Sequence, residues 1–254
     1  MSFKSWRSYS IFSNSVRSKQ RYILDIESKQ FLDSIIDTCE NRITELKKDS
    51  IVCRAQTGCS WHPYYQTDPE TEEDIYVDDL PCPYHPERMK PLKDSALEGR
   101  ANSKGIPCLY VATDKETAMS EVRPSLGSII SIGLLKLKKD IKVLDFSVEH
   151  GNMNFNIIFK EKPTQDEINK AVWLEIDNAF SKPTKASDSE SDYAPTQIIS
   201  EYIKSKGYDG IAYKSSLADG HNIALFDLEV ADVAKCAIYK PAKIKIDFEQ
   251  VTEH

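Results

Sequence analysis

A glycine-bracketed segment over residues 99–107 is the most unusual part of the sequence. It reads Gly-Arg-Ala-Asn-Ser-Lys-Gly-Ile-Pro and precedes a short apolar run. Such a loop can aim Arg100 at phosphate oxygens, because the planar guanidinium donates several hydrogen bonds in a fixed fork. The alternative is a surface turn with an incidental arginine, and the spacing favours neither interpretation.

Two further charged residues stand in apolar surroundings. Glu121 follows Ala118 and Met119, so the pattern predicts a carboxylate at the edge of the core, in a partly desolvated place. A structural ion pair with Arg123 or a lysine is the alternative, and spacing alone ranks it first. Arg54 ends a predicted inner strand, where a guanidinium is out of place unless it meets an anion.

Polar side chains at other predicted strands complete the candidate set. Tyr110 lies in an apolar strand and is either a site residue or part of the core. Ser215 and Ser216 follow one strand and Asn222 begins the next. These hydroxyl and amide groups are either loop caps or polar ligands for a sugar.

A zinc site is the competing interpretation of the cysteines and histidines. Cys59 and His62, and then Cys82 and His85, repeat a Cys-x-x-His spacing that offers four ligands. The usual strand and helix signals are missing around them, and an acidic stretch separates the two pairs. Short ligand spacings of this kind often arise by chance, so the sequence predicts no bound metal.

The elements that must position these residues begin with a helical segment. Apolar residues recur every three or four positions over residues 27–48, which predicts a helix. We therefore expect an N-terminal helical element over residues 1–49 and a second domain over residues 50–254. Residues 57–98 contain six prolines and an acidic run, which predict a long solvated loop.

The remaining pattern predicts a mixed α+β fold. A capping box at Thr113–Glu116 begins a helix that Pro124 ends. Strands and helices follow without regular alternation, which excludes a doubly wound sheet. The predicted strands are 50–54, 107–112, 128–137, 142–146, 210–213, 222–226, 234–239 and 243–248, the later helices are 166–180 and 195–207, and 186–192 is an acidic loop.

Composition excludes several classes of protein. The net charge of -7 over 254 residues argues against binding a nucleic-acid backbone. The longest apolar stretch, 128–137, is much shorter than the roughly 20 residues of a membrane helix. The N-terminus lacks the apolar core of a secretory signal, so we expect a cytoplasmic protein whose six cysteines are reduced thiols.

From Arg54 to Phe226 the sequence resembles the RES domain, a family named for an arginine, a glutamate and a serine. The segments that carry the resemblance occur in the family's order. They are Val52-Cys53-Arg54-Ala55, Gly99-Arg100-Ala101-Asn102, Gly105-Ile106-Pro107, Leu109-Tyr110, the segment 117–124, Val143-Leu144-Asp145, the segments 193–197 and 207–215, Gly220-His221-Asn222 and Leu225-Phe226. The N-terminal element and the insertion at 57–98 look like a longer subgroup of that family.

The resemblance implies an ADP-ribosyltransferase-like fold, with mixed sheets around an NAD cleft. Family members are typically bacterial toxins that degrade NAD by phosphorolysis or hydrolysis and are inhibited by an antitoxin. The function that the resemblance implies is cleavage of the nicotinamide–ribose bond, with NAD as substrate and no separate cofactor. The alternatives are an ADP-ribosyltransferase on the same fold and a zinc-stapled binding module without turnover. An antitoxin or other regulatory partner and a homo-oligomer both stay open.

The resemblance also implies roles for individual residues. Glu121 is the expected catalytic carboxylate, Arg54 and Arg100 bind the NAD phosphates, and Tyr110 packs against the nicotinamide end. We assign catalysis to Glu121, Arg54 and Tyr110. We assign substrate binding to Arg100, Asn102, Ser215, Ser216 and Asn222, where Ser216 is an alternative to its neighbour.

Overall fold

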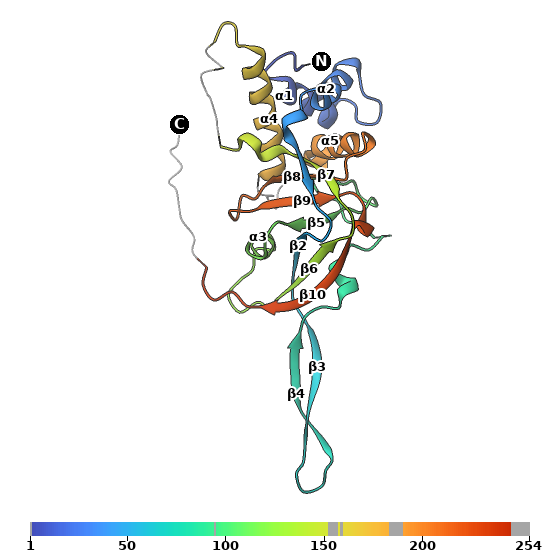
Figure 1. The fold of residues 1–254 in the computed structure, drawn as a ribbon. Coiled ribbons are helices and arrows are strands. Elements are labelled where there is room, and N and C mark those ends of the chain that lie inside the picture. Colours follow the sequence, from blue (N-terminus) through green and yellow to red (C-terminus); the bar gives the residue numbers. More distant parts are fainter. Residues whose placement is uncertain (1, 94, 152–156, 158–159, 183–189, 245–254) are drawn as a thin grey trace.

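The computed structural model describes residues 2–93, 95–151, 157, 160–182 and 190–244. Its helices are α1 (Ser8–Ser18), α2 (Ile26–Asp37), α3 (Lys115–Glu121), α4 (Gln165–Ser181) and α5 (Ala194–Ser205). Its strands are β1 (Ile43–Leu46), β2 (Ile51–Thr57), β3 (Ser60–Thr67), β4 (Asp74–Cys82), β5 (Leu109–Ala112), β6 (Ile130–Leu137), β7 (Ile141–Asp145), β8 (Gly210–Lys214), β9 (His221–Leu225) and β10 (Ala231–Tyr239). Figure 1 shows a helical layer at one end, a twisted sheet in the middle and a long hairpin at the other end.

The central sheet has eight strands in the order β1-β7-β8-β9-β5-β2-β6-β10. The pair β7–β8 is parallel and the other neighbours are antiparallel. The predicted α+β class is therefore confirmed. The sheet is narrowest between β5 and β2, where a single residue pair, Cys53 with Ala112, joins two groups of strands. The strands thus form a mixed half, β1-β7-β8-β9-β5, and an antiparallel half, β2-β6-β10, of one sheet.

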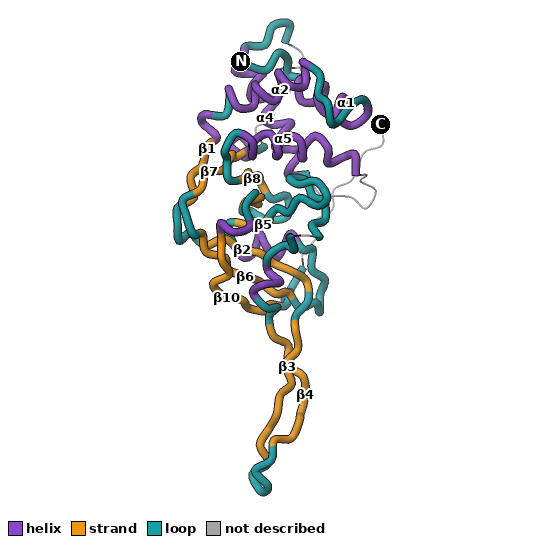
Figure 2. Tube along the Cα trace, turned by 90° about the vertical axis from the view of Figure 1, so that its right-hand side faces the viewer, coloured by secondary structure: helices purple, strands orange, loops and turns teal. Residues whose placement is uncertain are grey.

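The helical layer covers one face of β7 and β8. Helices α4 and α5 pack on β8, and α1 and α2 pack on these helices (Figure 2). Along β8 the side chains alternate, so that Ile211 and Tyr213 join the cluster under the helices. Ala212 between them joins the cluster on the opposite face of the sheet. This alternation places Tyr213 between the sheet and the helices.

The predicted helix over residues 27–48 is wrong beyond Asp37. Thr38 has non-helical dihedrals, and Ile43–Leu46 forms β1, which pairs with β7. The β-branched residues Ile43 and Thr44 suit an extended strand, so tertiary pairing overrides the helical spacing of the apolar residues. The first 49 residues therefore contribute a strand to the central sheet as well as two helices.

The predicted loop over residues 57–98 is also wrong in part, because β3 and β4 form an antiparallel hairpin. Aromatic and β-branched residues favour these strands, among them Trp61, Tyr65 and Val77. Pro63 and Pro81 are tolerated because each strand of a two-stranded ribbon has an edge without a ladder partner. The side chains of the hairpin are nearly all exposed, as the acidic run predicted.

The other predicted elements agree with the structure to within a few residues, at α4, α5 and β5–β10. Of the predicted strand over 243–248, residues 245–248 lie outside the described part, and so do residues 186–189 of the predicted acidic loop. Residues 190–193 form a 3-10 turn. No described helix is long and apolar enough to cross a membrane.

Candidate functional site

Glu121 is the last residue of α3, a helix that begins one residue later than predicted. The N-cap is Asp114, whose carboxylate accepts the Thr117 backbone N–H at 2.8 Å. The predicted capping box at Thr113 is therefore wrong, since the aspartate takes the capping position and the Thr113 hydroxyl accepts the backbone N–H of His221, the first residue of β9. After α3, Arg123 adopts a left-handed backbone conformation with a φ of 47°. The chain then leaves the helix through Pro124.

Two neutral donors hold the Glu121 carboxylate. Its Oε1 accepts hydrogen bonds from Ser215 Oγ at 2.6 Å and from Asn222 Nδ2 at 2.6 Å. Short bonds of this kind to an ionised acceptor are among the stronger ones in proteins. The Glu121 residue itself is exposed, so the expected partly desolvated place at the core edge is wrong. The reason is that α3 ends at an opening to solvent, where only one carboxylate oxygen contacts these donors.

The donors lie at the facing ends of β8 and β9. Ser215 is buried and also accepts the Leu217 backbone N–H at 3.1 Å, whereas its neighbour Ser216 is exposed. The loop between the strands passes close to the start of α3. A Cβ on Gly220 would lie 2.2 Å from the Thr117 hydroxyl oxygen, so any other residue there would displace the side chains at the start of α3. Of the two adjoining serines, Ser215 is therefore the one that contacts Glu121.

Glu121 borders a cavity of about 270 Å³ between α3 and four strands. The cavity is lined by Cys53, Arg54, Ala55, Tyr110, Val111, Ala112, Ala118, Glu121, Val122, Tyr213 and Asn222. We call it the Glu121 cavity. It brings together four residues that the sequence predicted from separate segments, namely Arg54, Tyr110, Glu121 and Asn222.

Arg54 lies in the middle of β2 rather than at its end, which corrects the sequence-based position. Its Nη1 donates to the Tyr110 carbonyl at 3.1 Å, and its buried Nε has no hydrogen-bond partner among the described residues. Burial lowers the pKa of Arg54, yet a guanidinium stays charged in proteins. An unpaired buried donor costs free energy, so an anion in the Glu121 cavity would stabilise this side chain.

Tyr110 is held by the turn that carries Arg100. Its hydroxyl donates to Asn102 Oδ1 at 2.7 Å and accepts the Ala101 backbone N–H at 2.9 Å. A Cβ on Gly99 would lie 2.5 Å from this hydroxyl, so glycine is required at that position. Asn102 is buried, and its amide nitrogen donates to backbone carbonyls of the same loop. In the structure Asn102 therefore positions Tyr110.

Gln197 on α5 supports the same turn. Its Nε2 donates to the Gly99 carbonyl at 3.0 Å and to the Asn102 carbonyl at 3.1 Å. Gln197 belongs to one of the segments that carry the family resemblance, and the sequence predicted no role for it. A polar residue on the buried face of a predicted helix was the signal available for it.

Arg100 does not line the Glu121 cavity. It lines a second cavity of about 610 Å³ between α1, α4 and α5, and its guanidinium donates to the Phe180 carbonyl. The charges of Arg100 and Glu121, one beside each cavity, both act on the pKa of Tyr213. Burial raises the pKa of Tyr213 well above its ordinary value, the Arg100 charge lowers it and the Glu121 charge raises it. Tyr213 was assigned no role from the sequence, because its alternating pattern is that of a core residue.

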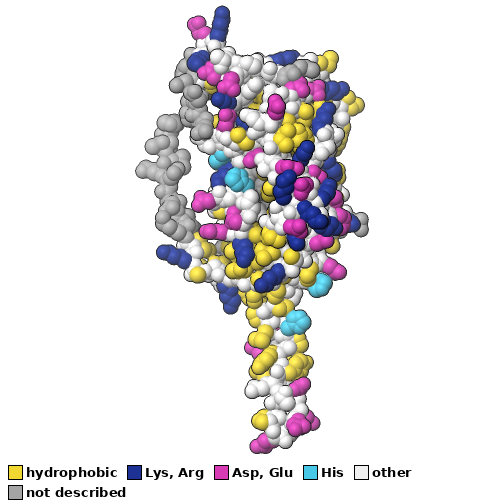
Figure 3. Space-filling model, in the orientation of Figure 1, with side chains coloured by type: hydrophobic (Ala, Val, Ile, Leu, Met, Phe, Trp, Pro, Cys, Tyr) yellow, Lys and Arg dark blue, Asp and Glu magenta, His cyan; other side chains and the backbone are white. Residues whose placement is uncertain are grey.

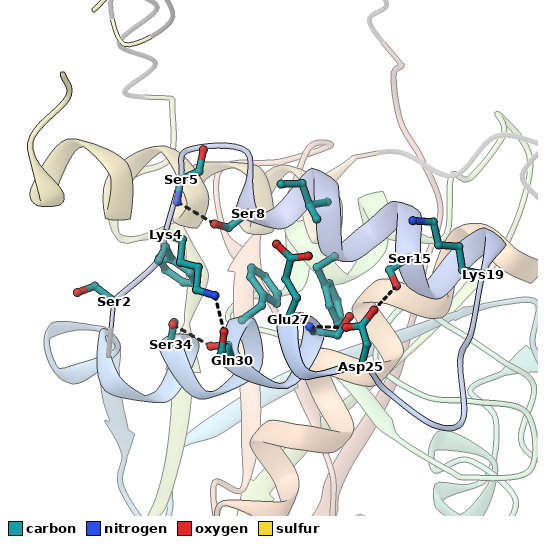
Figure 4. A pocket seen from close by; sticks show the side chains of 15 residues that line it. Ser2, Lys4, Ser5, Ser8, Ser15, Lys19, Asp25, Glu27, Gln30 and Ser34 are labelled. Atoms are coloured by element: carbon teal, nitrogen blue, oxygen red, sulfur yellow. Dashed lines mark hydrogen bonds between the residues drawn. The ribbon is translucent and has the colours of Figure 1, made fainter. Parts of the chain in front are cut away.

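A third cavity, of about 280 Å³, lies between α1 and α2 (Figure 4). Polar side chains around it bond to one another, as Lys4 does to Gln30 and Ser15 does to Asp25. Asp25 also accepts the Ser28 backbone N–H and so caps α2. These contacts hold the two N-terminal helices together.

The zinc interpretation finds no support in the described residues. His62 lies opposite Leu80 in the hairpin, and Cys82 lies opposite Ser60. Across the described ranges, no group of three or more histidine, cysteine, aspartate and glutamate residues is arranged to hold a metal ion.

Comparisons with known proteins identify a family. A family model described as the RES domain matches residues 81–248. This range includes Arg100, Tyr110, Glu121 and Ser215, and it begins after Arg54. No curated protein matches the chain.

Among solved structures, the chain is similar to the crystal structure of the MbcT–MbcA toxin–antitoxin complex of M. tuberculosis. The two chains are 13% identical, with a TM-score of 0.43, over 82% of this chain and 93% of the other. Because that TM-score is low, the family assignment rests on the sequence match alone.

Proposed function

Because the chain belongs to the RES domain family, we propose that it is an enzyme that cleaves the nicotinamide–ribose bond of NAD in the Glu121 cavity. One observation carries the proposal: Ser215 and Asn222 fix a carboxylate at the rim of a cavity that is also lined by Arg54, whose buried Nε has no hydrogen-bond partner among the described residues.

The carboxylate suits the charge that this reaction develops. Cleavage of an N-glycosidic bond gives the ribose positive charge in the transition state, as in glycoside hydrolysis. Glu121 beside the anomeric carbon or the ribose hydroxyls would stabilise that charge more in the transition state than in the ground state. The hydrogen bonds from Ser215 and Asn222 keep the carboxylate in place before the reaction begins, which reduces the reorganisation that the reaction needs.

The other walls of the Glu121 cavity suit the rest of the substrate. Tyr110 and Tyr213 are the aromatic residues among those that line it, and they are the groups available to pack against the nicotinamide ring. Burial raises the pKa of Tyr110 well above its ordinary value, so its hydroxyl stays protonated and bonded to Asn102. Nicotinamide leaves as a neutral molecule, so the reaction needs no general acid. Arg54 supplies a positive charge for a phosphate oxygen.

The group that attacks the ribose defines the reaction class. Phosphate would make the enzyme an NAD phosphorylase, and water would make it an NAD glycohydrolase. Transfer to a protein or small-molecule acceptor would make it an ADP-ribosyltransferase, with the same bond broken. A cytoplasmic toxin or defence-type effector, inhibited by an antitoxin or another regulatory protein, is the biological setting that the family resemblance suggests.

Product analysis tests the proposal directly. NAD is incubated with the purified protein, with and without inorganic phosphate, and nicotinamide and the ADP-ribose product are separated by chromatography. We expect nicotinamide release, and the dependence on phosphate identifies the acceptor. NAD that stays intact at high enzyme concentration under both conditions would contradict the proposed function.

The matched variants are Glu121→Gln and Glu116→Gln, both on α3. Glu121→Gln keeps the size of the side chain and removes the charge, so turnover should fall at least ~100-fold, the low end for a positioned electrostatic group. Glu116 is exposed and outside the Glu121 cavity, so Glu116→Gln should keep wild-type turnover. A folded Glu121→Gln protein with full turnover would remove Glu121 from catalysis.

A further inference from the structure

The β3–β4 hairpin exposes an unusual amount of apolar surface. Seven large apolar side chains of these two strands are each between 45% and 59% exposed, Trp61 and Tyr65 among them. The strands contact mainly each other, and the hairpin projects from the rest of the molecule (Figure 1). Single exposed apolar residues are normal, whereas a contiguous set marks an interaction surface. Tryptophan and tyrosine are also the residues that are enriched where proteins bind one another.

The strand register divides these side chains between the two faces of the hairpin. Residues that pair directly across antiparallel strands share a face, and successive residues along a strand alternate between faces. Trp61 pairs with Pro81 and Tyr65 pairs with Tyr76, so one face carries three aromatic rings. The ring centroids of Tyr65 and Tyr76 are 5.9 Å apart, which agrees with this placement. Tyr64, the remaining tyrosine of the two strands, lies on the opposite face.

Carboxylates lie on the same face as the three rings. Asp74 pairs with Thr67 and Asp79 pairs with Pro63, so both aspartates share the face of Trp61 and Tyr65. We call this surface, with its three rings and two aspartates, the Trp61 face. Residues 60–82 contain seven aspartates and glutamates and no lysine or arginine, so the hairpin itself supplies no cation to them. Figure 3 shows hydrophobic side chains along the hairpin and acidic side chains toward its tip.

Rings and carboxylates together select a cationic occupant. The planar guanidinium of arginine stacks on tryptophan and tyrosine rings, and it donates two parallel hydrogen bonds to a carboxylate. Side chains on one face of an extended chain recur about every 7 Å. A polypeptide with arginines at alternate positions therefore presents them at the same repeat as the groups of the Trp61 face.

The charge of the hairpin disfavours other occupants. A nucleic acid and an anionic membrane both carry negative charge and are repelled by the acidic residues. A second copy of the chain would bring an equally acidic hairpin, so two hairpins repel each other. The surface is therefore suited to a basic partner of different sequence.

We propose that the Trp61 face is a docking surface for an arginine-rich polypeptide segment of another protein. Guanidinium groups stack on Trp61 and Tyr65, and ion pairs with Asp74 and Asp79 orient the segment along the strands. The family match begins at residue 81, so β3 and most of β4 add this surface to the family domain. No residue of the hairpin lines the Glu121 cavity, so docking does not depend on the proposed function.

Fluorescence anisotropy of a labelled oligoarginine peptide, titrated with the full chain, tests the inference. The variant Trp61→Ser/Tyr65→Ser removes two rings from the Trp61 face and keeps every carboxylate. Its matched control, His62→Ser/Tyr64→Ser, changes two residues of the same strand that lie on the opposite face. We expect the variant to bind the peptide about fivefold or more weakly, because two exposed cation–π contacts are lost. The control should bind the peptide as the wild type does.

Two further measurements separate stacking from charge. Asp74→Asn/Asp79→Asn keeps the rings and removes two charges, so it should weaken binding about threefold or more at low salt. Glu27→Gln/Glu40→Gln removes two charges from exposed residues outside the hairpin and should leave binding unchanged. An oligolysine peptide of the same length should bind the wild type more weakly than oligoarginine, because an ammonium group lacks the planar fork.

Three results would overturn the inference. The first is an equal loss of binding, or no loss, in the two ring variants, and the second is equal affinity of the wild type for oligoarginine and oligolysine. The third is a wild-type dimer in analytical ultracentrifugation that Trp61→Ser/Tyr65→Ser converts to a monomer, since the Trp61 face would then join copies of this chain. If that variant does not fold, the two charge variants decide, and equal affinities of these two for oligoarginine reject the docking surface.

Discussion

The Glu121 cavity and the β3–β4 hairpin are built by opposite means. In the cavity, hydrogen bonds connect residues far apart in the sequence, such as Glu121 with Ser215 and with Asn222, which are 94 and 101 positions away. In the hairpin, the strands contact mainly each other, and the ring centroids of Tyr65 and Tyr76 are 5.9 Å apart. Large apolar side chains there stay exposed, among them Trp61 at 59%.

This difference separates the part of the chain that requires tertiary structure from the part that does not. The family match covers most of the cavity and includes only the end of β4. A substitution around the cavity should therefore change both folding and activity, whereas a substitution in the hairpin should change neither. Three variants sharpen or break this comparison, and a fourth, at Glu175 on α4, measures an effect outside both regions.

Asn102→Ala should have the largest effect on folding. It removes the acceptor of the buried Tyr110 hydroxyl and the donor of several loop carbonyls. Leaving buried polar groups unsatisfied costs about 1–3 kcal/mol, so we expect a loss of about 2–3 kcal/mol in the free energy of unfolding. Urea denaturation measures it, with the exposed Asn41→Ala as control. A loss equal to that of the control would mean that the turn holds Tyr110 without Asn102.

Ser215→Ala should lower the turnover of NAD by about tenfold, the equivalent of one hydrogen bond of roughly 1.4 kcal/mol to a charged group. Ser216→Ala is the matched control, because Ser216 is adjacent in sequence and exposed. Nicotinamide release by both variants is the measurement. A larger loss in Ser216→Ala would show that the second serine, and not the first, serves the site.

Glu175→Gln should change how stability depends on pH. The pKa of this carboxyl is raised from its ordinary value to about 7 in the folded protein. The folded state therefore binds the proton more tightly than the unfolded state, and stability falls as pH rises from about 4.5 to 7. With allowance for its partial exposure, we expect a loss on the order of 1 kcal/mol across that window.

The Gln variant should lose this pH-dependent decrease. Melting temperatures at pH 5 and pH 8 for both proteins measure it, with the exposed Glu27→Gln as control. If the difference between the two pH values is the same in the wild type and Glu175→Gln, Glu175 does not have a raised pKa.

Trp61→Ala should have the smallest effect. The side chain is exposed and lies on the hairpin, outside the residues that match the family, so the free energy of unfolding should change by less than about 0.5 kcal/mol. Nicotinamide release should equal that of the wild type. A marked loss of activity in a stable Trp61→Ala protein would break the comparison, because it would connect the hairpin to the cavity.

Periodicity predicted α4, which buries one face, and apolar composition predicted β6 and β8, whose residues are buried on both faces. It failed at β1, where the apolar spacing suited a helix but pairing with β7 determined the structure. It also failed at the hairpin, because prolines and acidic residues concealed two edge strands. Local pattern cannot report pairing with a distant segment, which is the cause of the error at β1.

The residues of the site show the same limit. Arg54, Tyr110, Glu121 and Asn222 were predicted and lie around one cavity. The spacing of the glycine-bracketed turn marked Arg100 as unusual but did not show which side of the turn the guanidinium faces. Arg100 lines the second cavity, where packing of α1 against α4 and α5 creates the space.

The hairpin gives the molecule an electric dipole moment. Residues 60–82 contain seven aspartates and glutamates and no lysine or arginine, and the remaining 33 acidic residues equal the 33 basic ones in number. The entire net charge of -7 therefore lies on one arm that projects from an electrically balanced body (Figure 3). Such a molecule orients in an electric field. When it approaches a positively charged surface, the hairpin points toward that surface.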